Sequence, residues 1–184
     1  MRKMYLSAPL PFVGQKRMFA KEFMKVLEQY PDGTLFVDLF GGSGLLSHIT
    51  KSLKPHSTVI YNDFDNYRFR MKHIPQTNQL LADIREMVGN SVPRHKIIKG
   101  ELRERIFSRI EQEENTTGYV DFITLSSSLL FSMKYKLSVQ DMRKEALYNN
   151  IRKTGYPECT DYLEGLEIVS CDYKEVFNRY KDIP

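Results

Sequence analysis

The first feature that could take part in ligand binding or catalysis is a glycine-rich turn followed by an acidic residue. Gly41, Gly42 and Gly44 come directly after an apolar run, and Asp63 follows about 20 residues later. Glycine has no Cβ, so backbone N–H groups in such a turn can approach a ligand closely. A carboxylate at the end of the next strand can accept hydrogen bonds from a ribose diol. This spacing favours a nucleotide-like ligand, although a tight strand–helix connection would use the same glycines.

A strand–helix–strand unit must position these residues. The apolar run at residues 34–39 predicts a strand buried on both faces of a parallel sheet. The glycine turn leads into a helix that Pro55 and His56 interrupt, and residues 58–61 predict a second strand. This order is typical of an α/β sheet, in which ligands bind beyond the carboxyl ends of the strands.

The other expected elements divide the chain into two parts. Helices are expected at residues 15–30, 66–88 (with a potential break near Pro75), 99–114 and 140–151. An apolar aromatic patch is expected at 119–131, and a last strand at 166–170. We therefore predict a cofactor-binding half-domain made of residues 1–88 and 163–184. Residues 89–162 would be a mainly helical insertion, with a possible role in target recognition.

Composition limits the class of protein. The chain has 184 residues, 41% of them hydrophobic and 27% charged, which is typical of a globular domain with its own core. A net charge of +4 is compatible with a polyanionic partner. Cys159 and Cys171 have no CxxC or Cys/His partners, so we expect reduced thiols and no metal site. With no signal-like start and no spanning apolar segment, we expect a cytoplasmic protein without membrane contact.

Four segments occur in an order that is more specific than any one of them. They are residues 8–16 (APLPFVGQK), 36–44 (FVDLFGGSG), 61–65 (YNDFD) and 166–173 (LEIVSCDY). In this order they resemble the motifs of the Dam-type DNA adenine-N6 methyltransferases, the alpha group of the D12 class. The first resembles that family's Pro-Phe/Tyr-x-Gly-Gly-Lys signature, and the others resemble its three cofactor motifs. The resemblance covers about residues 7–74 and 163–177.

The resemblance implies a Rossmann-like sheet that binds S-adenosylmethionine. It also implies site-specific methyl transfer to adenine N6 in double-stranded DNA, the chemistry of restriction–modification systems. The implied cofactor-binding residues are Phe12, Lys16, Asp38, Phe40, Gly42, Gly44, Asp63, Phe64, Asp172 and Tyr173.

Each of these residues has an implied role. Lys16 and the loop before it would lie beside the methionine carboxylate, and Asp38 would face the ammonium group. Phe40, Gly42 and Gly44 would shape the methionyl and ribose part of the pocket. Asp63 would bind the ribose hydroxyls and Phe64 would pack on the adenine. Asp172 and the Tyr173 N–H would bind the adenine edge. Singly, Asp38 and Asp172 could instead be helix or turn caps and Lys16 a solvated residue.

The sequence departs from the family at three places. Leu39 stands where the family has proline, and Gln15 where it usually has a second glycine. The catalytic Asp-Pro-Pro-Tyr loop is absent from these residues, and residues 182–184 (DIP) resemble it only superficially. We therefore assign no catalytic residue. We expect an incomplete sheet and a truncated chain that cannot methylate without a complementary C-terminal fragment.

Basic residues in the insertion suit contacts with DNA phosphates, although Lys and Arg face solvent in most proteins. The predicted DNA-binding residues are Arg94, Lys96, Lys134, Lys136, Arg143 and Arg152. Two other readings stay open. One is a non-catalytic module that binds DNA or another partner. The other is a nucleotide-dependent Rossmann enzyme such as an oxidoreductase, for which Ser47 replaces the expected third glycine.

Overall fold

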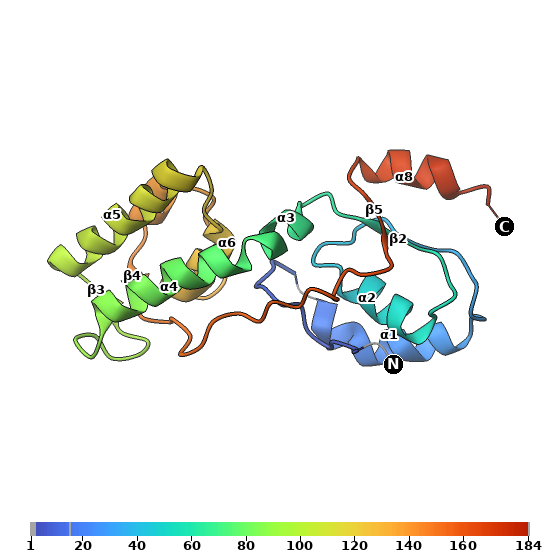
Figure 1. Ribbon diagram of the computed structural model, residues 1–184, viewed down its shortest axis with the longest axis horizontal. Coiled ribbons are helices and arrows are strands. Elements are labelled where there is room, and N and C mark those ends of the chain that lie inside the picture. Colours follow the sequence, from blue (N-terminus) through green and yellow to red (C-terminus); the bar gives the residue numbers. More distant parts are fainter. Residues whose placement is uncertain (1–2, 15, 184) are drawn as a thin grey trace. The chain divides into compact units, whose positions relative to one another are not determined.

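The computed structural model describes residues 3–14 and 16–183. The chain forms two compact units, shown with their elements in Figure 1. The first unit comprises Met1–Met71 and Cys159–Pro184, and the second comprises Lys72–Glu158. Each unit has its own buried apolar residues.

A three-stranded parallel sheet forms the centre of the first unit. Its strands are β1 (Phe36–Asp38), β2 (Val59–Asn62) and β5 (Glu167–Val169), in the order β1-β2-β5. In the register, Ile60 of β2 lies opposite Val37 and Glu167. All four residues of the central strand β2 are buried, as the apolar pattern predicts for a parallel sheet. Because the strands are parallel, their carboxyl ends meet at one edge.

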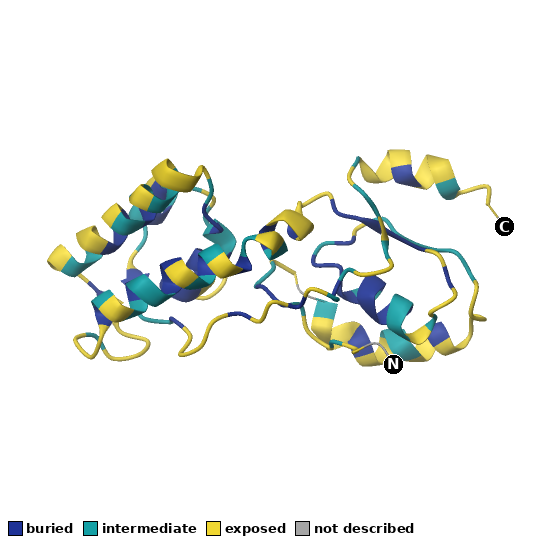
Figure 2. Cartoon of the chain, in the orientation of Figure 1, coloured by how far each residue is buried: buried dark blue, intermediate teal, exposed yellow. Residues whose placement is uncertain are grey.

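Short helices surround this sheet. They are α1 (Ala20–Glu28), α2 (Leu45–Leu53), α3 (Tyr67–Lys72) and α8 (Tyr173–Tyr180), and a 3-10 turn, η1 (Lys16–Phe19), precedes α1. Helix α2 begins directly after the glycine turn and is largely buried, with Leu45 and Ile49 inaccessible to solvent (Figure 2). Helix α2 contacts both α1 and the sheet. The glycine turn is therefore held between β1 and a packed helix.

The buried side chain of Asn62 joins the ends of all three strands. It lies at the end of β2, where its Nδ2 donates hydrogen bonds to the carbonyls of Leu39, at 3.1 Å, and Cys171, at 2.9 Å. Its Oδ1 accepts a hydrogen bond from the Cys171 N–H at 3.2 Å. Leu39 follows β1 and Cys171 follows β5 closely, so one amide sets the spacing of both loops.

The second unit is mainly helical. It contains α4 (Ile74–Val88), α5 (Gly100–Thr117), α6 (Phe122–Leu129) and α7 (Val139–Arg143), with a small antiparallel pair, β3 (Ile97–Ile98) and β4 (Leu147–Tyr148). Ile84 of α4 and Phe107 and Ile110 of α5 are fully buried in its core. The amphipathic spacing of these helices explains the burial.

The observed boundaries can be compared with the expected ones. The helix expected at residues 66–88 is divided at His73, close to the break expected near Pro75, which lies in the first turn of α4. Helix α4 then belongs to the second unit, where Arg109 of α5 pairs with Asp83 at 2.8 Å. The helix expected at residues 140–151 ends early, because the backbone of Leu147 and Tyr148 pairs with β3. The periodicity of apolar residues in the sequence does not predict either of these tertiary contacts.

The coarse fold class is confirmed. The structure is mixed α/β with a small parallel sheet and a helical second unit. Among the described residues, no helix is both long and apolar enough to cross a membrane. Over the same residues, both cysteines are free thiols and no group of acidic, histidine or cysteine side chains could hold a metal ion.

Replacement of Asn62 by alanine is expected to lower the free energy of unfolding of the first unit by about 2–3 kcal/mol, because backbone groups of Leu39 and Cys171 lose their partner. Urea titration followed by circular dichroism measures this change. The exposed Asn90 provides the control variant Asn90→Ala, which should unfold as the wild type does. Equal midpoints for the two variants would contradict the role given to Asn62.

Candidate functional site

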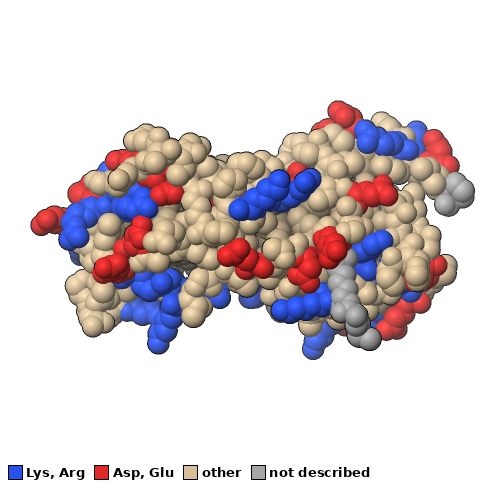
Figure 3. Space-filling model, viewed as in Figure 1, with Lys and Arg blue, Asp and Glu red and all other residues tan. Residues whose placement is uncertain are grey.

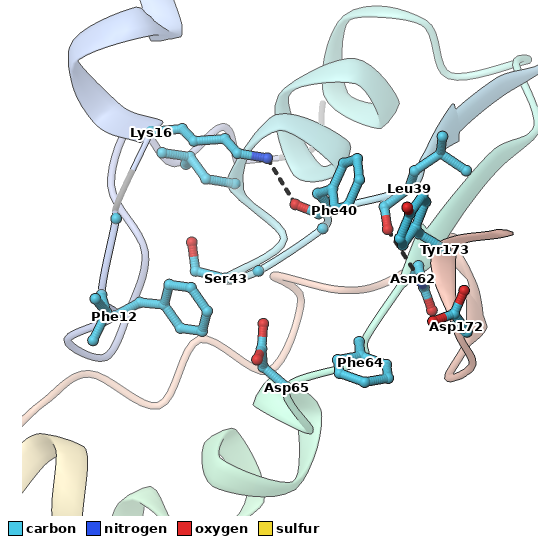
Figure 4. Close-up of a pocket in the computed structure, with 15 residues that line it drawn as sticks. Phe12, Lys16, Leu39, Phe40, Ser43, Asn62, Phe64, Asp65, Asp172 and Tyr173 are labelled. Atoms are coloured by element: carbon cyan, nitrogen blue, oxygen red, sulfur yellow. Dashed lines mark hydrogen bonds between the residues drawn. The ribbon is translucent and has the colours of Figure 1, made fainter. Parts of the chain in front are cut away.

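A cavity of about 380 Å³ lies at the carboxyl ends of the three strands (Figure 4). This volume falls within the range of about 300–1,000 Å³ that is usual for small-molecule sites. Its lining comes from four separate segments: Phe12, Val13, Gly14 and Lys16; Leu39, Phe40, Gly41, Gly42, Ser43 and Leu45; Asn62, Phe64 and Asp65; and Asp172 and Tyr173. The cavity therefore exists only in the folded first unit.

The glycine turn forms one wall and has no space for side chains. A Cβ on Gly41 would lie 2.7 Å from the Asn62 carbonyl oxygen and would also clash with the Tyr61 ring. Gly42 has φ +53°, in the left-handed region that favours glycine. The Tyr61 hydroxyl lies 2.7 Å from the Gly42 carbonyl oxygen. Burial, followed by the charge of Asp63, raises the pKa of Tyr61, so its phenol stays protonated and supports the turn.

A cation and an anion lie near each other beside the turn. The Lys16 Nζ donates a hydrogen bond to the Phe40 carbonyl at 2.7 Å and lies 4.0 Å from Asp38 Oδ1. Asp38 does not line the cavity, since its Oδ2 accepts a hydrogen bond from the Ser47 hydroxyl at 2.7 Å. The Lys16 side chain is 37% exposed and can turn toward a ligand anion.

Exposed aromatic rings surround the cavity. Phe40 is 63% exposed, Phe64 66% and Tyr173 41%. The ring centroids of Phe40 and Tyr173 are 5.0 Å apart, and Phe12 is held edge-on against Tyr67. Exposed apolar rings that gather at one cavity mark a binding site for an apolar or planar group.

Two acidic residues near the end of β2 have different roles. Asp63 is only 3% exposed, and its carboxylate accepts hydrogen bonds from the backbone N–H groups of Tyr67, at 2.6 Å, and Arg68, at 2.9 Å. It thus caps α3 and does not line the cavity. Asp65 is exposed and lines the cavity. The structure therefore places Asp65, and not Asp63, where a ligand hydroxyl could reach a carboxylate.

Asp172 both caps a helix and is accessible from the cavity. Its Oδ1 accepts a hydrogen bond from the Lys174 N–H at 2.8 Å and so caps α8. The residue also lines the cavity, next to Tyr173. Capping orients this carboxylate at the cavity wall.

Most residues that the sequence assigns to the cofactor come together here. Those lining the cavity are Phe12, Lys16, Phe40, Gly42, Phe64, Asp172 and Tyr173. Asp38, Gly44 and Asp63 lie just behind the lining, where they support the turn and α3. Gln15, a departure from the motif, lies outside the described residues. Asp65, Asn62 and Ser43 were missed, although Asp65 repeats the acidic pattern two residues after Asp63.

Several predicted DNA-binding residues are held in ion pairs. Lys134 and Lys136 both pair with Glu145, and their hydrogen bonds lower the pKa of that carboxyl. A separate pair of carboxylates, Glu104 and Glu111, holds Arg143 at 2.7 and 3.0 Å. Figure 3 accordingly shows basic and acidic side chains intermingled on the face it presents.

The other predicted basic residues are more accessible. Arg94 and Lys96 are exposed, with no ion pair among the described residues. Arg152 is exposed too, with its guanidinium 4.4 Å from the centre of the Tyr156 ring. These three residues are the ones that phosphates could reach without breaking an ion pair.

Comparison with known proteins gives one informative match. No family model matches the chain. Over 98% of its length, the chain is 40% identical to a protein of Haemophilus influenzae named "Putative methyltransferase". The chain spans 62% of the length of that protein.

Alanine variants of Asp63 and Asp65 are expected to differ in stability. Asp63→Ala removes the cap of α3 and leaves two N–H groups unpaired, at a cost of about 2 kcal/mol. Asp65→Ala removes an exposed carboxylate and should change stability by less than about 0.5 kcal/mol. Chemical denaturation of both variants measures these values. A larger loss for Asp65→Ala would show that the two roles are reversed.

Proposed function

We propose that the first unit binds S-adenosylmethionine in the cavity at the strand ends, as part of a DNA adenine methyltransferase. The observation that carries the proposal is the convergence of residues 12–16, 39–45, 62–65 and 172–173 on one cavity. These segments coincide with the four motifs that resemble the Dam-type enzymes. The name of the Haemophilus influenzae protein agrees with methyl transfer in general.

The residues present fit the polar groups of this cofactor. Lys16 suits the methionyl carboxylate. Asp38, which the motif assigns to the ammonium group, lies behind the lining, where it pairs with Lys16 and accepts a hydrogen bond from Ser47. We assign to Asp65 the role of ribose ligand that the resemblance implies for Asp63. Asp172 and the backbone of Tyr173 suit the hydrogen-bonding edge of the adenine.

The apolar part of the ligand also has partners. Phe64, Phe40 and Tyr173 offer exposed rings to a flat adenine. Gly41 and Gly42 of the turn belong to the cavity lining, where their backbone would lie beside the ribose and methionyl part. When bound, the cofactor supplies an electrophilic methyl group on a sulfonium sulfur, and the residues of this chain hold and orient it.

We propose adenine N6 in double-stranded DNA as the methyl acceptor, on the strength of the motifs alone. The Asp-Pro-Pro-Tyr sequence does not occur in these 184 residues. The chain itself is therefore expected to bind the cofactor without transferring the methyl group, and transfer would need that loop from a complementary fragment.

Titration calorimetry is expected to detect S-adenosylmethionine and its demethylated product, S-adenosylhomocysteine, and to give no heat with NAD. Asp65→Ala should weaken S-adenosylmethionine binding roughly tenfold, because one hydrogen bond to a charged group is lost. The exposed Asp182, outside the cavity, supplies the control Asp182→Ala, which should bind as the wild type does. Binding of NAD in place of S-adenosylmethionine would support a nucleotide-dependent oxidoreductase instead.

Binding of duplex DNA is expected to weaken as salt is added, with log Kd linear in log salt concentration. Replacing Arg94 and Lys96 together by alanine should reduce this slope by about 2, or roughly 1 per lost phosphate contact. Lys136→Ala is the matched comparison and should change the slope less, because Lys136 is already in an ion pair with Glu145. Fluorescence anisotropy with a short labelled duplex measures the slopes. Equal slopes for all proteins would contradict this interface.

A further inference from the structure

The second unit contains a cavity of about 280 Å³ that the cofactor site does not use. It lies between the segment of residues 131–135, the end of α6, and the residues His95 and Asn150. Its lining includes hydroxyls from Ser126 and Tyr135, an imidazole and an amide, together with the apolar Phe131 and Met133. The lining contains no carboxylate. The lining also includes Lys134, which pairs with Glu145. Such a mixture suits a ligand with polar edges.

Two residues in this lining have a backbone conformation that side-chain-bearing residues rarely adopt. His95 has φ +65° and Met133 has φ +69°, and within the described chain the only other non-glycine residue with positive φ is Asn66. Residues held in this region tend to gather at binding sites, where the surrounding structure compensates for the strain.

Hydrogen bonds hold the His95 loop in place. The His95 N–H donates to the Asn149 carbonyl at 2.8 Å, and the Asn149 N–H donates to the Lys96 carbonyl at 2.9 Å. The side-chain Nδ2 of Asn149 donates to the Val92 carbonyl at 2.7 Å. One residue next to β4 therefore fixes the loop before β3 at three points.

The opposite wall is also fixed. The Ser126 hydroxyl accepts a hydrogen bond from the Lys136 N–H at 3.0 Å, and a turn brings the Lys134 N–H to 3.1 Å from the Phe131 carbonyl. Glu145 pairs with Lys134 and Lys136. Lys134 therefore already has a carboxylate partner, which it shares with Lys136.

The orientation of His95 follows from its neighbour. The Asn150 Nδ2 donates to the Leu130 carbonyl at 3.0 Å, so the Asn150 Oδ1 faces the His95 Nδ1 at 2.8 Å. The Nδ1 then carries the hydrogen, and a neutral imidazole leaves Nε2 as an acceptor. Such an acceptor can receive a hydrogen bond from an amino group on a base edge.

We propose that this cavity takes an unstacked DNA base, with Phe131 and Met133 as the apolar surfaces against its faces. Phe131 is 61% exposed and Met133 81%, so both can reach a ligand. Aromatic and apolar side chains stack on bases, and such side chains can also separate neighbouring base pairs. The exposed Arg94 and Lys96, on either side of His95, supply cations for the flanking phosphates. The inference rests on the proposed function for its choice of DNA.

The test compares two duplexes of the same sequence, one fully paired and one with a single central mismatch. A base in a mismatch is easier to unstack, so a base-binding cavity should favour the mismatched duplex, by about tenfold. Fluorescence anisotropy of the 184-residue chain measures both affinities. His95→Ala and Phe131→Ala should abolish the preference. Leu137→Ala, which removes an exposed apolar side chain from the same segment but outside the cavity, should retain it.

The outcomes separate this inference from the proposed function. Equal binding of the two duplexes, or an unchanged preference in the folded His95→Ala and Phe131→Ala variants, would overturn the base-binding cavity. Stronger, variant-sensitive binding of the corresponding single-stranded RNA would overturn the choice of DNA. Calorimetry with S-adenosylmethionine does not depend on the binding of the duplexes, on the effect of the variants or on the binding of RNA. If the variants lose the mismatch preference but still bind the cofactor, the result supports the base-binding cavity. If the wild type does not bind the cofactor, the result counts against the proposed function alone.

Discussion

The amide of Asn62 is the constraint on which the first unit depends. Three strands of three or four residues form a small sheet, so the backbone ladder that joins their ends is short. Asn62 supplies that connection from the central strand, to the loops after β1 and β5. Both loops line the cavity, so the interaction that stabilises the sheet edge also sets the width of the site.

The same edge separates structural acids from accessible ones. The carboxylates of Asp38 and Asp63 face hydrogen-bond donors behind the lining, whereas Asp65 and Asp172 reach the cavity. The helices that start at this edge provide the donors, which are the backbone N–H groups of α3 for the buried Asp63 and the Ser47 hydroxyl of α2 for Asp38. These two acids stabilise α3 and the turn, which leaves Asp65 and Asp172 available for a ligand.

Much of this arrangement could be predicted from the sequence. The apolar runs at β1 and β2, the glycine turn and the Asp172-Tyr173 pair are local signals, and parallel pairing brings them together without further information. The choice between Asp63 and Asp65 could not be predicted, because it depends on which carboxylate meets the N–H groups of α3. The end of the helix expected at 140–151 likewise depends on pairing with distant residues.

For the basic residues, too, the sequence does not predict which side chains are available to a ligand. In the sequence, Arg94 and Arg143 are equivalent cations, and only the fold places Glu104 and Glu111 beside Arg143. Burial and pairing decide which charges remain available. The sequence therefore predicts the chemistry of a site better than it predicts which member of a pair performs it.

The central claim is that remote segments converge on one S-adenosylmethionine site. The most direct measurement is a two-dimensional ¹H–¹⁵N spectrum of the labelled chain, recorded as S-adenosylmethionine is added. The account predicts saturable shifts in the amides of Gly14, Gly42, Phe64 and Tyr173, with the second unit unchanged. Shifts confined to the second unit, or none at millimolar ligand, would contradict it.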